Sequence, residues 1–134
     1  MDIISLHPYG LSKESPDIYL PFDNHTTFRD VETLKQIMER NGQSNKEIWI
    51  TEFGWQVGSS LGGILMTEEL QAKNLIHSLK IISDEWPYVS VAIWFWDLDR
   101  HIPQYAAVAD GLELIRLDKT IRPSGAYLRE FLME

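Results

Sequence analysis

The sequence predicts an α/β fold made of three successive strand–helix units with parallel strands. Three short runs rich in apolar and β-branched residues, 2–7, 47–53 and 89–96, are each followed by a segment with helical periodicity. Strands that alternate with helices imply parallel pairing through right-handed crossovers. The connections after the strands are long, about ten to twenty residues, whereas those after the helices fall within about 2 to 6. Loops at the carboxyl ends of parallel strands build the sites of α/β proteins, so we expect one functional face there.

The composition describes one globular domain, residues 1–134, and argues against two classes of partner. With 44% hydrophobic and 24% charged side chains, the 134 residues are enough for a real core. The net charge of −8 disfavours nucleic acid and anionic membranes, because both carry negative phosphates. The absence of cysteine excludes disulfides and thiolate metal ligands. No signal peptide or membrane-spanning stretch is visible, so the sequence assigns no compartment.

The first unit begins with a strand predicted over residues 2–7, which Pro8 and Gly10 terminate. A long polar connection leads to a helix predicted to begin near Thr27, with acidic residues in its first turn that suit the helix dipole. Gly42 stands where a C-terminal cap is expected. This helix should bury one apolar stripe, formed by Val31, Leu34, Ile37 and Met38.

The second unit has its strand in residues 47–53 and its helix from an N-cap at Thr67 to about Trp86, where Pro87 ends it. A loop rich in Gly and Ser, residues 56–66, separates the two and is expected to be mobile. The apolar positions of the helix are Ala72, Leu75, Ile76, Leu79 and Ile82.

The third unit begins with a strand over residues 89–96, followed by a loop that reaches Gly111. Residues 112–121 are predicted to form a small hairpin that turns at Asp118 and Lys119. A last helix should begin at Pro123, a residue suited to a first helical turn. Its apolar positions are Tyr127, Leu128, Phe131 and Leu132.

The central strand ends in a carboxylate that does not fit its surroundings. Residues 47–53 read EIWITEF, an apolar run typical of a strand buried on both faces, and Glu52 interrupts it near the end. A structural Glu here would cap the strand or pair with a surface cation. However, α/β enzymes place catalytic groups at the carboxyl tips of parallel strands, and the loop pattern puts Glu52 there. We therefore predict that Glu52 is catalytic.

Aromatic side chains and an imidazole at the same strand ends predict a sugar site. Aromatic faces stack on the C–H faces of sugars, and a carboxylate beside them can attack an anomeric carbon. A tyrosine hydroxyl can hold such a carboxylate in its ionised form. Core packing is the alternative for the aromatic residues of the third strand, and we expect Trp49 to be core. The predicted substrate-binding residues are His7, Tyr9, Trp55, Trp94 and Trp96.

Three motifs in sequence order, DIISLHPYG, EIWITEFGW and VSVAIWFWDLD, resemble the last three strands of a clan A glycoside hydrolase. That clan contains retaining enzymes on a (β/α)8 barrel, so the resemblance implies a partial TIM barrel with strands six to eight. It implies that Glu52 is the nucleophile, and that His7 and Tyr9 contact both the nucleophile and the sugar. It also implies that Trp94, or secondly Trp96, forms the floor of the subsite where cleavage occurs.

The resemblance implies an incomplete enzyme for O-glycosyl bonds. The clan's acid/base Glu follows an Asn at the end of strand four, and no Asn-Glu pair occurs in this sequence. A complete barrel needs about 250 residues, and retaining hydrolysis needs two carboxyl groups about 5 to 5.5 Å apart. We therefore expect the isolated chain to be inactive, and to form a homo-oligomer or bind a complementary N-terminal barrel half. The local carboxylates that could substitute match no family motif; they are Asp97, Asp99, Asp110 and Glu113.

The same residues are compatible with other functions. A carbohydrate-binding or interaction remnant, which keeps the aromatic face without the chemistry, is the main alternative because the acid/base is missing. A divalent metal held by Asp97, Asp99 and His101, with His7 or His25 joining, is disfavoured against an ordinary polar loop, so we predict no metal or cofactor. A phosphate-binding domain is disfavoured because no Gly-rich turn directly precedes a helix.

Overall fold

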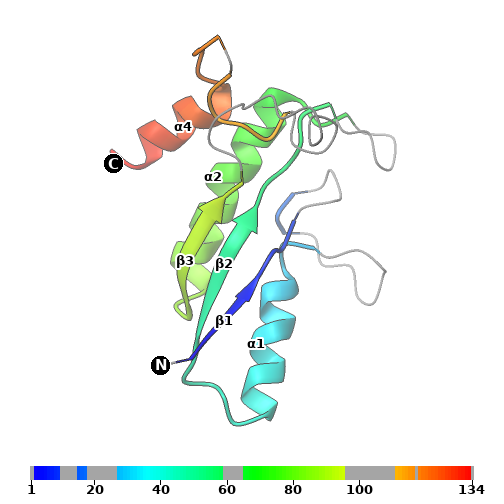
Figure 1. Cartoon of the computed structure of the whole chain (residues 1–134), viewed down its shortest axis with the longest axis vertical. Helices are drawn as coiled ribbons and strands as arrows, with labels where there is room; N and C mark the ends of the chain where they lie inside the picture. Colours follow the sequence, from blue (N-terminus) through cyan, green and yellow to red (C-terminus); the bar gives the residue numbers. More distant parts are fainter. Residues whose placement is uncertain are drawn as a thin grey trace.

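A computed structural model describes residues 2–9, 15–17, 27–58, 65–95, 111–116 and 118–133 (Figure 1). Within these residues, one sheet contains three parallel strands in the order β1 (Ile3–Leu6), β2 (Glu47–Phe53) and β3 (Val89–Trp94). The described helices are α1 (Asp30–Arg40), α2 (Glu68–Glu85) and α4 (Pro123–Phe131). The prediction of three parallel strand–helix units in an α/β fold is confirmed.

The hydrophobic core lies between one face of the sheet and the helices α1 and α2, and Figure 1 shows α2 behind the strands. Ile48 and Ile50 are fully buried because the alternation of β2 directs both side chains toward the helices. Aromatic rings continue this core toward the end of β2. The core cluster is formed by Phe28, Val31, Met38, Ile48, Ile50, Phe53, Trp55, Met66, Leu75, Ile81 and Trp86.

The opposite face of the sheet, called the open face below, carries side chains that are exposed or only half-buried. Trp49 points to this face because its neighbours Ile48 and Ile50 point to the helices, and its Nε1 donates to Ser90 Oγ at 3.1 Å. Ile93 of β3 is 49% exposed there, although parallel sheets are usually covered on both faces. The expectation that β2 is buried on both faces is therefore wrong within the described residues, because the described helices cover one face.

The element boundaries follow from local signals that were readable in the sequence. Thr67 caps α2, and its Oγ1 accepts a hydrogen bond from Leu70 N at 3.1 Å. Helix α1 begins at Asp30 rather than near Thr27, because Asp30 Oδ2 accepts from Thr27 N at 2.7 Å and thereby closes a turn ahead of the helix. The predicted hairpin contains an antiparallel bridge between Ile115 and Ile121. Residue 96 of the predicted third strand lies outside the described residues.

Gly111→Ala is expected to destabilise the fold more than Gly42→Ala, although both glycines have positive φ, 91° and 69°. A Cβ at Gly111 would meet the Val57 carbonyl oxygen at 2.6 Å. A Cβ at Gly42 would have no atom of the described residues within 4 Å. We expect a loss of about 2–5 kcal/mol at Gly111 from backbone strain plus overpacking, and about 1–2 kcal/mol at Gly42 from strain alone. Urea unfolding of both variants measures the difference, and equal losses would contradict the packing described here.

Candidate active site

Parallel pairing brings the carboxyl ends of β1, β2 and β3 to one edge of the sheet. Glu52 is the next-to-last residue of β2, and Trp94 is the last residue of β3. His7 and Tyr9 follow β1 in a tight turn, in which Tyr9 N donates to the His7 carbonyl at 3.0 Å. The side chains of Glu52, His7 and Tyr9, called the carboxylate cluster below, come together at this edge.

An irregularity in the register of β2 places Glu52 on the open face. Ile50 pairs with Ala92 and Phe53 pairs with Trp94, so two residues of β2 stand opposite the single residue Ile93. Without this extra residue, alternation would direct Glu52 into the core together with Ile50. The bulge instead buries Phe53 and leaves the Glu52 side chain 33% exposed. Glu52 is therefore partly exposed, although its place in an apolar strand suggested that it would be buried.

Two neighbouring side chains contact the Glu52 carboxylate. The Tyr9 hydroxyl donates a short hydrogen bond to Oε2, and His7 Nδ1 lies 3.5 Å from the same oxygen. The ring of Tyr9 is held edge-on against Phe95, with 6.0 Å between the ring centroids. The predicted neighbourhood of His7, Tyr9 and Glu52 is thus observed as a group of contacting side chains, in which Tyr9 orients the carboxylate.

Tyr9 is held in its protonated form. Burial raises the pKa of Tyr9 far above its ordinary value, and the hydrogen bond to Glu52 and the charge of that carboxylate raise it further. A phenol that keeps its proton remains a donor toward Glu52 across the whole physiological pH range. Within the part of the chain that the structure describes, this leaves the second oxygen of the carboxylate, Oε1, as the atom with which Glu52 could act on another molecule.

The raised pKa of Tyr9 predicts a loss of stability at alkaline pH. An unfolded tyrosine ionises near pH 10, while Tyr9 in the fold keeps its proton, so the free energy of unfolding should fall as the pH rises above about 10. Tyr9→Phe should make the free energy of unfolding decrease less steeply with pH, because the variant lacks the phenol that ionises on unfolding. Tyr127→Phe is the control, because the charge of Glu69 and the hydrogen bond to it raise the pKa of the surface residue Tyr127 less than the pKa of Tyr9 is raised, so this variant should remove a smaller part of the fall. Urea unfolding between pH 8 and 11 measures the effect, and identical pH profiles for the two variants would contradict it.

The predicted aromatic residues of the site occupy different places. Trp94 is half-buried, and its ring packs edge-on against Phe53 at 5.4 Å while its Nε1 donates to the Leu112 carbonyl at 2.9 Å. Trp55, predicted to bind substrate, is only 1% exposed and packs at 6.2 Å from Trp94 in the core. Its ring therefore offers no surface to a sugar in this structure. Trp96 lies outside the described residues.

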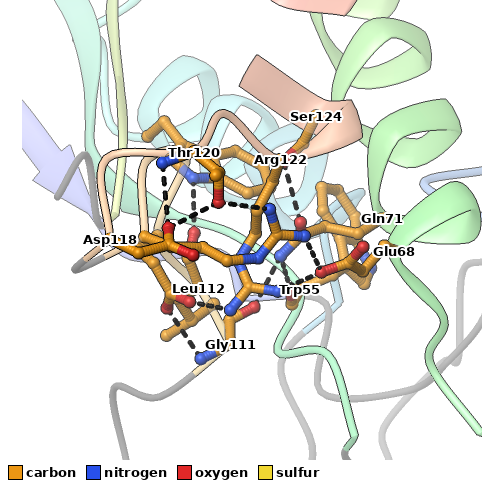
Figure 2. Close-up of polar contacts among 12 residues, drawn as sticks. Trp55, Glu68, Gln71, Gly111, Leu112, Asp118, Thr120, Arg122 and Ser124 are labelled. Carbon is orange, nitrogen blue, oxygen red and sulfur yellow. Dashed lines mark hydrogen bonds and ion pairs between the residues drawn. The ribbon is translucent and has the colours of Figure 1, made fainter. Parts of the chain in front are cut away.

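A buried polar network behind the strand ends was not predicted from the sequence (Figure 2). Glu113, considered above as a substitute acid, is 1% exposed, forms an ion pair with Arg122 and accepts a hydrogen bond from Gly111 N at 2.7 Å. Arg122 also pairs with Glu68, whose pKa is lowered chiefly by its hydrogen bond to Arg116. Because its oxygens are occupied by these partners and its side chain is buried, Glu113 has a structural role.

The described residues contain no group of three or more acidic or imidazole side chains arranged to hold a metal ion. The Asp97, Asp99 and His101 motif and His25 lie outside the residues that the structure describes. Asp110 lies outside them as well. Among the described helices, none combines the length and the apolar character needed to cross a membrane.

Comparison with known proteins identifies the fold. No protein-family model matches the sequence, and a search of curated proteins finds no match. Among solved structures, the chain is similar to β-glucuronidase from Bifidobacterium dentium complexed with coumarin-3-O-glucuronide, with 17% identity and a TM-score of 0.61. It is also similar to a GH2 β-galacturonidase from Eisenbergiella tayi bound to glycerol, with 14% identity and a TM-score of 0.65.

A third similar structure is β-glucuronidase from Ruminococcus gnavus in complex with N1-substituted uronic isofagomine, with 16% identity and a TM-score of 0.61. The matches cover 99%, 96% and 97% of this chain but only 21%, 23% and 23% of the three enzymes. At these identities the similarity shows a shared fold. The chain thus has the fold of a portion, somewhat over a fifth, of these glycoside hydrolases. At the level of the fold, this agrees with the resemblance of the sequence to glycoside hydrolases.

Proposed function

We propose that this chain is the C-terminal part of a retaining O-glycoside hydrolase barrel and supplies its nucleophile, Glu52. The observation that carries the proposal is the carboxylate cluster. Glu52 stands at the carboxyl end of the central parallel strand, is turned to the open face by the bulge, and is oriented by Tyr9 and His7. Similarity of the fold to glycoside hydrolases supports it.

In the proposed reaction, a Glu52 oxygen attacks the anomeric carbon of a β-linked glycoside while the bond to the leaving oxygen breaks. An acid/base group protonates the leaving oxygen and then removes a proton from the water that hydrolyses the glycosyl ester. Tyr9 donates its hydrogen bond to the oxygen that does not attack, which fixes the direction of the other oxygen. Trp94, which packs against Phe53 and Trp55 and stays half-buried, is proposed to contribute the floor of the subsite with the exposed part of its ring.

The acid/base group is proposed to come from another polypeptide segment. Retaining enzymes need a second carboxyl group about 5 to 5.5 Å from the nucleophile. Glu113 is engaged by Arg122 and Gly111, and the sequence contains no Asn-Glu pair. We therefore propose that the chain by itself does not hydrolyse glycosides and requires the N-terminal part of a barrel, supplied as a separate polypeptide or fused ahead of it.

The test is hydrolysis by a reconstituted enzyme. The chain is combined with the N-terminal barrel portion of a structurally similar β-glucuronidase and given aryl β-glucuronide, β-galacturonide and β-glucoside. The first two are chosen because the similar enzymes are a β-glucuronidase and a β-galacturonidase. Hydrolysis with retention at the anomeric carbon, seen by NMR, supports the proposal. Sugar binding without hydrolysis, in an assembly shown to be intact, favours a carbohydrate-binding remnant instead.

The remaining strands of the barrel are proposed to assemble against the open face and beside the two outer strands of the described sheet, β1 and β3. Edge strands and uncovered sheet faces promote pairing with other chains, so the isolated chain should self-associate. Ile93→Lys should reduce this association, whereas Ile121→Lys should not, because Ile121 is equally exposed at 49% but lies in the hairpin away from the sheet. Size-exclusion chromatography with light scattering at micromolar concentration measures it, and a monomeric wild-type chain would contradict it.

A further inference from the structure

Gln71 of α2 is a fully buried polar side chain that does not belong to the carboxylate cluster. Its Nε2 donates to two main-chain carbonyls, Trp55 O at 2.7 Å and Gly111 O at 2.7 Å. Its Oε1 accepts from the hydroxyl of the buried Ser124, at the start of α4, at 2.8 Å. Figure 2 shows Gln71 and Ser124 converging on this point. A single amide group thus joins α2, α4 and two loops.

One carbonyl belongs to the segment that continues the strand of Glu52, and the other belongs to the segment that contacts Trp94. Trp55 follows Glu52 by three residues, so its main chain continues the strand end that presents the carboxylate. Gly111 precedes Leu112, whose carbonyl accepts from Nε1 of Trp94 at 2.9 Å. The two segments also bind each other directly, since Val57 N donates to Gly111 O at 2.9 Å. Gln71 therefore contacts the main chain next to both site elements.

The chemistry of these contacts requires an amide. Two carbonyl oxygens need two N–H donors, and a hydroxyl donor needs an acceptor, which together describe a glutamine side chain in one orientation. An ionised glutamate would offer only acceptors to the two carbonyls, and methionine, of similar length, would offer neither donor. Partners left without hydrogen bonds in a buried place must move or admit water.

We propose that Gln71 is a positioning residue, which holds the strand ends that carry Glu52 and Trp94 in their relative places. The inference rests on the proposed function insofar as it concerns catalysis. Such a role differs from a purely structural one, because a variant without the amide should still form the helices and strands but should lose the relative placement of the two loop segments. Among the tryptophans of the described residues, the effect of a substitution should accordingly be confined to Trp55, whose carbonyl Gln71 binds, and to Trp94, whose partner Leu112 follows Gly111.

The test is ¹⁹F NMR of the full chain labelled with 5-fluorotryptophan, with resonances assigned by single Trp→Phe variants. Gln71→Met should shift or broaden the resonances of Trp55 and Trp94. Trp49 and Trp86 are internal controls, because their indoles donate to Ser90 and Glu32 and not to the loop segments. Ser124→Ala, which leaves both bonds to the loops in place, should leave the resonances of Trp49, Trp55, Trp86 and Trp94 near their wild-type positions.

Two results would overturn the proposal. Unchanged Trp55 and Trp94 resonances in Gln71→Met would show that the amide positions nothing. Changes in the resonances of Trp49 and Trp86 as well as those of Trp55 and Trp94, together with loss of far-ultraviolet circular dichroism, would show that Gln71 is needed for folding as a whole. In the reconstituted enzyme, Gln71→Met should slow the covalent labelling of Glu52 by an activated 2-deoxy-2-fluoro glycoside about 10- to 100-fold, as expected for a misplaced reacting group. Should wild-type Glu52 not label, the proposed function fails, while the NMR result still decides the role of Gln71.

Discussion

Replacing Arg122 with leucine is expected to lower the free energy of unfolding by about 3–5 kcal/mol, the range measured when one partner of a buried ion pair is removed. Arg122 pairs with Glu113, whose side chain is nearly inaccessible to solvent, and with Glu68 of α2. The leucine variant leaves the Glu113 carboxylate buried without a compensating charge. Chemical unfolding in urea, followed by circular dichroism, measures the change.

Two further variants isolate the cause of this loss. Lys73→Leu removes a partner from the exposed pair of Lys73 and Glu69, 3.4 Å apart, and should change stability by no more than about 1 kcal/mol. The double variant Arg122→Leu, Glu113→Leu should recover part of the loss, since no unpaired charge remains buried. An Arg122→Leu protein as stable as the Lys73→Leu protein would show that the buried pair contributes little.

Replacing Glu52 with alanine is expected to reduce hydrolysis by the reconstituted enzyme by on the order of 10⁴- to 10⁶-fold, the range seen when a catalytic group is removed from a hydrolase. Azide, small enough to occupy the vacated space, should attack the anomeric carbon from the same side and expel the aryl oxide. The product should then be a glycosyl azide with inverted configuration, which NMR identifies.

Glu47→Gln is the matched control for Glu52→Ala. Glu47 lies on the same strand at its opposite end and accepts a hydrogen bond from Ser90 Oγ at 2.7 Å. Its replacement should leave hydrolysis near the wild-type rate and azide without effect. Loss of activity in both variants would indicate that any change in β2 disables the assembly, and would remove the support that Glu52→Ala gives to a nucleophilic role.

The sequence allowed the order of elements and the composition of the carboxylate cluster to be predicted for physical reasons. Parallel strands bring their carboxyl ends to one edge, so residues that end separate runs, such as Tyr9 and Glu52, must come near each other. Thr67 was recognisable as an N-cap because its hydroxyl suits the free N–H groups of a first turn.

The remaining features depend on side-chain packing that no periodic pattern encodes. A strict alternation places Glu52 in the core, and only the register shift opposite Ile93 brings it to the open face. Trp55 stands two residues after the strand and was predicted to bind substrate, yet its ring fills space between Phe28 and Trp94. No pattern in the sequence distinguishes Gln71 from an ordinary polar helix residue, because its partners are main-chain carbonyls distant in sequence.

The most direct test of a nucleophilic Glu52 is covalent trapping. An activated 2-deoxy-2-fluoro glycoside of the sugar that the reconstituted enzyme hydrolyses is incubated with the chain alone and with the assembled enzyme, and peptides are mapped by mass spectrometry. We predict one glycosyl adduct per assembled enzyme, on Glu52, and no adduct on the isolated chain. An adduct on another carboxylate, or inactivation without any adduct on Glu52, would contradict the assignment.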